Sequence, residues 1–94
     1  MRTYLVTGAS RGIGFGLVQH ILGLSDTRVI ATCRDPSTTQ VFDDLIRDYQ
    51  ERLLIMMLDV TSEWSFEVLK EQLVEKSIFS IDVLIANAGI AGNL

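Results

Sequence analysis

Three glycines in the segment Thr-Gly-Ala-Ser-Arg-Gly-Ile-Gly, residues 7–14, constrain the fold of this chain more than any other feature. An apolar run, residues 4–6, leads into the segment, and apolar residues at helical spacing follow it up to Gly23. The pattern predicts a strand, a glycine turn and a helix. Glycines let a backbone turn sharply and approach a ligand closely, and the start of a helix offers free N–H groups to a phosphate. The segment therefore predicts an anion site, although its G-x-x-x-G-x-G spacing differs from the G-x-G-x-x-G of many dinucleotide folds.

The rest of the chain alternates between strand-like and helix-like segments. Strands are predicted over residues 3–7, 28–33, 53–58 and 81–86, and helices over residues 12–22, over 39–49, and from a cap at Thr61 or Ser62 to about Lys76. This βαβαβαβ order predicts an α/β fold, a doubly wound parallel sheet with right-handed crossovers. In the helix after Ser62, Phe66, Leu69 and Leu73 are expected to face the sheet, and Trp64 is expected to pack.

The carboxyl ends of the four predicted strands carry residues of a kind that a nucleotide could use. In a parallel sheet these ends lie along one edge, where ligands bind. They carry Gly8, the pair Cys33-Arg34, Asp59 and the turn Asn-Ala-Gly at 87–89. Taken alone, Asp59 is as readily a helix-capping or turn residue as a ligand contact, and Asn-Ala-Gly is an ordinary turn. Their occurrence together at the strand ends favours a nucleotide site.

On these motifs, the chain resembles the N-terminal half of a classical short-chain dehydrogenase/reductase. The resemblance rests on the glycine motif of residues 7–14, on Asp59-Val60 and on residues 87–89, where the family usually has Asn-Asn-Ala-Gly and this chain begins with Ala86. Residues 31–36, Ala-Thr-Cys-Arg-Asp-Pro, are most similar to the carbonyl-reductase-like, C-factor-like and sniffer-like members. The resemblance covers essentially the whole chain. It implies that residues 1–94 form the N-terminal part of an NAD(P)-binding Rossmann domain, a Rossmann-type sheet with strand order 3-2-1-4 that is truncated after the fourth strand.

The resemblance implies an activity whose catalytic residues lie beyond this chain. The activity is hydride transfer between NADPH and a carbonyl or alcohol, and the family's catalytic Ser and Tyr-x-x-x-Lys pair follow the fourth strand. The tyrosines here are Tyr4 and Tyr49, and neither has a lysine four residues on. No catalytic residue is therefore assigned, and a small carbonyl substrate is expected only where the catalytic half is present.

The resemblance also gives roles to individual positions. A first set would cradle the adenosine ribose and the pyrophosphate: Gly8, Ser10, Arg11, Gly12, Ile13 and Gly14. A second set would surround the adenine, with Asp59 accepting a hydrogen bond from its amino group, Leu58 and Val60 flanking the ring, and Asn87, Ala88 and Gly89 lining the adenine-ribose side. Thr7 is expected to be structural and to tie the glycine turn to the end of the fourth strand.

The charges near the end of the second strand favour NADP(H) over NAD(H). An NAD site normally places an acidic residue there to bind the ribose 2′-hydroxyl. Cys33 holds that place, Arg34 follows it, and Arg11 lies in the glycine turn. Two guanidinium groups suit a 2′-phosphate. The alternative is that both arginines are solvated surface residues. Asp35 is expected to turn away and to cap a helix that starts at Pro36.

Three function classes follow from these residues, and composition limits the partners. They are the NADP(H)-binding portion of an oxidoreductase, a non-catalytic nucleotide- or partner-binding remnant, and another Rossmann-type protein such as a methyltransferase. The two arginines and the Asn-Ala-Gly turn disfavour the third.

The net charge of −4 argues against nucleic acid and anionic membranes as partners, and no cluster of residues has metal-ligand spacing. The lone Cys33 fits the cytoplasm. The edge of the strand at 81–86 is expected to permit self-association.

Overall fold

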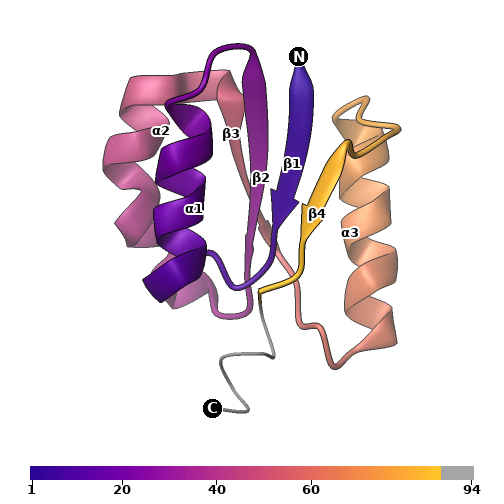
Figure 1. The fold of residues 1–94 in the computed structure, drawn as a ribbon. Helices are drawn as coiled ribbons and strands as arrows, with labels where there is room; N and C mark the ends of the chain where they lie inside the picture. The colour runs from indigo at the N-terminus through magenta and orange to yellow at the C-terminus, as the bar shows by residue number, and fades with distance from the viewer. Residues whose placement is uncertain (88–94) are drawn as a thin grey trace.

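The computed structural model describes residues 1–87, which form four strands and a series of helices (Figure 1). Ala88 and Gly89, two of the predicted site residues, lie outside the described residues. In chain order the elements are β1 (Arg2–Val6), α1 (Gly12–Leu22), β2 (Thr27–Cys33), the 3-10 helix η1 (Pro36–Phe42), α2 (Asp43–Tyr49), the 3-10 helix η2 (Gln50–Arg52), β3 (Leu53–Met57), α3 (Glu63–Glu75) and β4 (Val83–Ile85). No helix within residues 1–87 has the length and apolarity needed to cross a bilayer.

The four strands make one parallel sheet in the order β3-β2-β1-β4, which confirms the predicted α/β Rossmann-type topology. Leu5 of β1 lies between Ile30 of β2 and Leu84 of β4. Helices α1 and α2 cover one face, and α3 covers the other (Figure 1). Because the chain runs from β1 to β3 on one side and then returns to place β4 on the other, the order reverses beside β1. Ligands of such sheets bind at this point, beyond the carboxyl ends of the strands.

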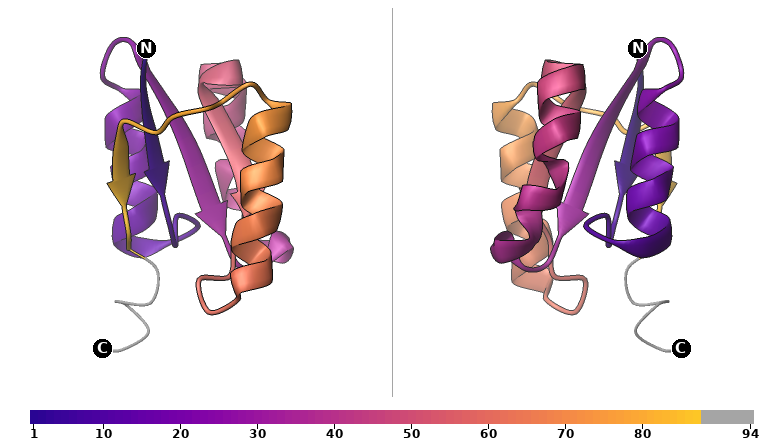
Figure 2. Two further views of the ribbon diagram at one scale, coloured as in Figure 1. Left: turned by 90° about the vertical axis from the view of Figure 1, so that its right-hand side faces the viewer. Right: turned by 90° about the vertical axis from the view of Figure 1, so that its left-hand side faces the viewer.

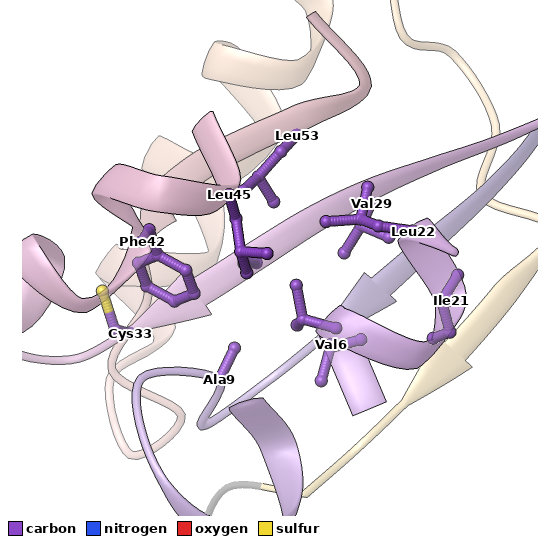
Figure 3. Close-up of a cluster of buried hydrophobic side chains, with 11 residues drawn as sticks. Val6, Ala9, Ile21, Leu22, Val29, Cys33, Phe42, Leu45 and Leu53 are labelled. Carbon is purple, nitrogen blue, oxygen red and sulfur yellow. The ribbon is translucent and has the colours of Figure 1, made fainter. Parts of the chain in front are cut away.

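Alternating residues of the central strands build a hydrophobic core on each face of the sheet. Val6 and Val29 point into the cluster beneath α1 and α2, whose largest fully buried side chain is Phe42 (Figure 3). Leu5 and Ile30 point the other way, into the cluster beneath α3. The sheet is therefore buried on both faces around β1 and β2, and this holds the strand ends in place.

The segment after β2 differs from the predicted single helix. It begins as the 3-10 helix η1, and α2 follows only at Asp43. Because a 3-10 helix has three residues per turn, residues four apart no longer share a face, and Val41 is exposed although Leu45 is buried. The expected cap is confirmed, since the carboxylate of Asp35 accepts a hydrogen bond of 2.9 Å from the backbone N–H of Ser37.

The first turns of α1 and α3 carry large apolar side chains that are exposed. Ile13 and Trp64 are each 76% exposed, and Phe66 is 42% exposed. These turns lie at the end of the sheet that carries the carboxyl ends of the strands (Figure 1), and Phe66 lines an apolar groove there. The packing expected of Trp64 is therefore wrong, whereas Leu69, one turn further along α3, is buried as expected.

On the α3 face, the sheet is open beside β4, where Leu84 is 65% exposed. In the left view of Figure 2, β1 and β4 lie to one side of α3. An apolar groove of about 400 Å³ runs there, lined by Leu5, Thr7, Leu58, Val60, Phe66, Leu69, Ile81, Leu84 and Ala86. Strand β4 is shorter than the predicted 81–86, and no strand within residues 1–87 pairs with its outer edge.

Candidate functional site

The turn between β1 and α1 contains two glycines in a backbone conformation that other residues rarely adopt. Gly8 and Gly12 each have a φ of +61°. A third glycine, Gly14, is buried, and a Cβ atom there would lie 2.3 Å from the carbonyl oxygen of Gly8. A Cβ atom at Gly12 would meet nothing within 4 Å. Gly14 is therefore required by the packing of the turn itself, whereas Gly12 borders open space that a ligand can enter.

Hydrogen bonds fix the turn to both neighbouring strands. The backbone N–H of Ala9 donates to the carbonyl oxygen of Thr32 at 3.0 Å. On the other side, the side-chain amide of Asn87 donates to the carbonyl oxygen of Gly8 at 3.2 Å, and the backbone N–H of Asn87 donates to the Thr7 hydroxyl oxygen at 2.9 Å. The structural role expected of Thr7 is confirmed. The bond to Thr32 was not foreseen, because no local signal in the sequence pairs it with Ala9.

Helix α1 begins at Gly12, directly after the first part of this turn. Arg11 occupies the N-cap position in extended conformation and makes no side-chain capping hydrogen bond, and the first turn holds no acidic residue. By contrast, α3 is capped by the Ser62 hydroxyl. The backbone N–H groups in the first turn of a helix have no partner within the helix. An uncapped start beside open space at Gly12 can therefore bind an anion.

Asp59, at the end of β3, is held by its neighbours. Its Oδ1 atom accepts hydrogen bonds from the backbone N–H of Thr61 at 3.0 Å and from the Thr61 hydroxyl at 2.6 Å, and its own N–H donates to the Ser65 hydroxyl oxygen at 2.8 Å. These bonds lower the pKa of the Asp59 carboxyl, and the charge of Arg34 lowers it further. The turn interpretation of Asp59 is confirmed, while Oδ2 accepts no hydrogen bond within residues 1–87. The role of Thr61 toward Asp59 was not predicted, although a hydroxyl residue two positions after Asp is typical of a turn in which the Asp side chain accepts hydrogen bonds.

Two arginines supply positive charge to this edge of the sheet. Arg11 and Arg34 are both exposed, and the ion pairs formed within residues 1–87 include neither. Hydrogen bonds from Ser37 lower the pKa of the Asp35 carboxyl, and the charge of Arg34 lowers it further. Cys33 is 2% exposed, and burial raises the pKa of its thiol. The end of β2 therefore presents a cation and a neutral thiol, with the nearest carboxylate engaged in a cap.

The remaining predicted site residues are placed as follows. Ser10 is half-buried in the glycine turn, and Ile13 is exposed at the start of α1. Leu58 is buried in the core beneath α3, and Val60 is partly buried against the same core, so both side chains line the apolar groove. The structure thus brings Gly8, Gly14 and Asn87 into one cluster and leaves Leu58 and Val60 on the α3 side of the sheet. The described part of the chain holds no group of three or more His, Cys, Asp or Glu that could bind a metal.

Comparison with protein families decides the class to which this chain belongs. The model of the short chain dehydrogenase family matches residues 2–94. The chain belongs to the short-chain dehydrogenase family. A curated member, the short chain dehydrogenase gsfK of Penicillium aethiopicum, is 47% identical over 90 residues, which are 96% of this chain and 36% of that protein.

Solved structures of reductases in this family have the same fold. An NADPH-bound carbonyl reductase from chicken fatty liver is 40% identical, with a TM-score of 0.83 over 95% of this chain and 35% of that one. A carbonyl reductase from Pseudomonas aeruginosa in complex with NADP is 36% identical, with a TM-score of 0.81 over 95% of this chain and 39% of that one. The chain thus spans about a third of the length of the relatives it matches. The predicted resemblance to carbonyl-reductase-like members is confirmed.

Proposed function

We propose that this chain is the NADP(H)-binding portion of an oxidoreductase of the short-chain dehydrogenase family. Residues 1–94 then form the N-terminal part of an NAD(P)-binding Rossmann domain. The observation that carries the proposal is the uncapped start of α1, which faces open space at Gly12 and has Arg11 at its N-cap position. Free N–H groups, a helix dipole and unpaired guanidinium groups together suit the phosphates of a dinucleotide.

The residues present fit such a cofactor. Gly8, Ser10, Arg11, Gly12, Ile13 and Gly14 would hold the pyrophosphate and the adenosine ribose. Asp59 would accept a hydrogen bond from the adenine amino group between Leu58 and Val60, and Asn87, Ala88 and Gly89 would line the adenine-ribose side. Space exists where the pyrophosphate must approach the backbone, because nothing lies within 4 Å of a Cβ position at Gly12.

The electrostatics at the end of β2 favour NADP(H) over NAD(H). A carboxylate at the position of Cys33 would repel a 2′-phosphate, and this chain has a buried thiol there. Arg34 follows and is exposed, so its guanidinium can donate two parallel hydrogen bonds to a phosphate. The two reductases described above are solved with NADPH and NADP.

The bound cofactor would supply a hydride for exchange between NADPH and a carbonyl or alcohol group. The chain's own residues would bind and orient the cofactor. The 94 residues contain no Tyr-x-x-x-Lys, so proton transfer to the substrate oxygen requires residues that this sequence does not hold. We therefore propose a small carbonyl substrate only for a protein that contains the catalytic half. The alternative is a non-catalytic nucleotide- or partner-binding remnant. The lone buried Cys33 supports a cytoplasmic location.

Calorimetric titration of the chain with NADPH and with NADH tests the cofactor. A charge-assisted hydrogen bond contributes about 1.5–3 kcal/mol, and each 1.4 kcal/mol is about tenfold in affinity. Arg34→Ala should therefore weaken NADPH about tenfold and leave NADH nearly unchanged. Arg2→Ala, which removes an exposed arginine at the other end of β1, is the control. Equal losses for both cofactors would refute the 2′-phosphate assignment. NADPH oxidation by the chain alone with an aldehyde would refute the proposal that proton transfer requires residues outside this sequence.

Self-association through β4 is the remaining proposal about partners. The outer edge of β4 is unpaired within residues 1–87, and Leu84 is 65% exposed beside the apolar groove. A free strand edge next to an apolar surface is a template for pairing with another chain. The partner we propose is a second copy of this chain.

A further inference from the structure

Of the two oxygens of the Asp59 carboxylate, Oδ1 accepts hydrogen bonds within residues 1–87 and Oδ2 accepts none. Both hydrogen bonds from Thr61 go to Oδ1, at 3.0 Å from the backbone N–H and 2.6 Å from the hydroxyl. The backbone of Asp59 is fixed separately, because its N–H donates to the Ser65 hydroxyl oxygen at 2.8 Å. Two donors on one oxygen hold the plane of the carboxylate, so Oδ2 is presented in one direction.

An ionised carboxylate oxygen can only accept hydrogen bonds. The amino group at position 6 of adenine donates and satisfies such an oxygen. The carbonyl at position 6 of hypoxanthine accepts hydrogen bonds instead. Its oxygen and Oδ2 of Asp59 would then face each other as two acceptors without a donor. A site whose acceptor is fixed in place discriminates between the two bases, because the wrong base leaves polar groups unpaired.

We infer that Thr61 is a positioning residue that fixes Oδ2 of Asp59 and thereby makes the purine subsite selective for a 6-amino base. The inference rests on the proposed function, in which Asp59 faces the adenine. Thr61 touches no part of the cofactor in this account and acts only through Asp59. Without the Thr61 hydroxyl, the carboxylate keeps one donor, the backbone N–H, and can rotate. It then binds the adenine amino group less well and can turn away from the hypoxanthine carbonyl.

Paired titrations with NADPH and with its reduced hypoxanthine analogue test this inference. The unaltered chain should bind NADPH about tenfold more tightly than the analogue, the effect of about one hydrogen bond to a charged acceptor. Thr61→Val should reduce that ratio to about two- to threefold, and Thr61→Ser, which keeps the hydroxyl, should restore it. Ser62→Ala is the matched control, because it removes the neighbouring hydroxyl that caps α3 and does not touch the Asp59 side chain.

The outcomes separate this inference from the proposed function. A chain that shows a cooperative melt and binds neither dinucleotide refutes the proposed function. A chain that binds both equally, or a Thr61→Val variant that keeps the full ratio, refutes the role of Thr61 and leaves the proposed function standing. Asp59→Asn gives an independent readout, since its amide can donate to a 6-carbonyl. That variant should bind the two dinucleotides about equally, and a retained preference for adenine would also overturn the inference.

Discussion

The side-chain amide nitrogen of Asn87 lies 3.2 Å from the carbonyl oxygen of Gly8, which is 79 residues earlier in the chain. A Cβ atom at Gly14 would lie 2.7 Å from this nitrogen and 2.3 Å from the Gly8 carbonyl oxygen. Gly8, Gly14 and Asn87 therefore pack against one another without room for a side chain. This contact ties the end of β4 to the start of α1 at the point where the strand order reverses.

Replacing Gly14 by Ala should destabilise the fold more than replacing Gly12. At Gly14 the new methyl group meets backbone, which cannot move aside, and we expect a loss of about 3 kcal/mol. At Gly12 the cost is that of a positive φ, about 1–2 kcal/mol, while the methyl enters open space and weakens NADPH binding. Urea denaturation and titration of both variants measure the two effects. Equal stability losses would contradict the distinction.

The alternation of elements and the handedness of crossovers predicted a parallel α/β sheet. The strand order was predicted from the family resemblance, because the same alternation is also compatible with another doubly wound order. The sequence also predicted α1 from Gly12 to Leu22 and the cap at Asp35, which depend on local chemistry. It did not predict the 3-10 start of the segment after β2. Apolar spacing there is compatible with either helix type, and tertiary packing of Phe42 decides between them.

For the site, sequence motifs located the glycine turn and the strand ends but could not separate the roles of the glycines. Gly12 and Gly14 look alike in the motif, and only the distances to Gly8 and Asn87 distinguish them. The bond from Thr61 to Asp59 had a local signal in its spacing. The bond from Ala9 to Thr32 had none, because it joins residues from different elements.

Asn87→Ala should loosen the contact between β4 and the glycine turn. It removes the hydrogen bond to the Gly8 carbonyl and leaves that oxygen without this donor, so we expect a loss of about 1–2 kcal/mol in the free energy of unfolding. Asn87→Asp should cost more at neutral pH, because a carboxylate would face a carbonyl oxygen. Urea denaturation measures both, and an Asp variant as stable as the parent would contradict the assigned donor.

Arg52 should contribute more to the free energy of unfolding than any exposed arginine. Its guanidinium donates to the carbonyl oxygens of Thr27, Leu22 and Leu24 at 2.7, 2.9 and 2.8 Å, and it lies 5.3 Å from the centre of the Tyr49 ring. Because these carbonyls include the end of α1, Arg52→Met should lower the free energy of unfolding by about 2–3 kcal/mol.

The control for Arg52 is Arg47→Met. Arg47 pairs with Asp44 and Asp48 at 3.2 Å on the surface, where such pairs contribute about 0–1 kcal/mol. Arg52→Lys should recover only part of the loss, because an ammonium group cannot reproduce the fork of the guanidinium. Equal effects of the two methionine substitutions would refute the assigned role.

The cap at Asp35 should make stability depend on pH in the acid range. Hydrogen bonds from Ser37, with a contribution from the charge of Arg34, lower the pKa of the Asp35 carboxyl. A carboxyl with a lowered pKa in the folded state stabilises the fold above its unfolded pKa, about 3.9, and this contribution is lost as the pH falls through the folded value. The difference in Tm between the parent and Asp35→Ala should therefore be full near neutral pH and shrink below about pH 4. Asp35→Asn, which caps without titrating, should differ from Asp35→Ala by the same amount at every pH.

Leu84→Lys should abolish self-association if the second copy docks at β4. The substitution places a charge on the exposed strand beside the groove, where burial against another chain would cost free energy, and charges on edge strands oppose pairing. The net charge of −4 opposes association only weakly at physiological salt, because salt screens the repulsion between charges that lie more than about 8 Å apart. Leu24→Lys, which alters an exposed leucine between α1 and β2, is the control. Sedimentation over a range of concentrations should show association for the parent and the control but not for Leu84→Lys. A parent that stays monomeric, or a Leu84→Lys variant that still associates, would exclude β4 as the contact.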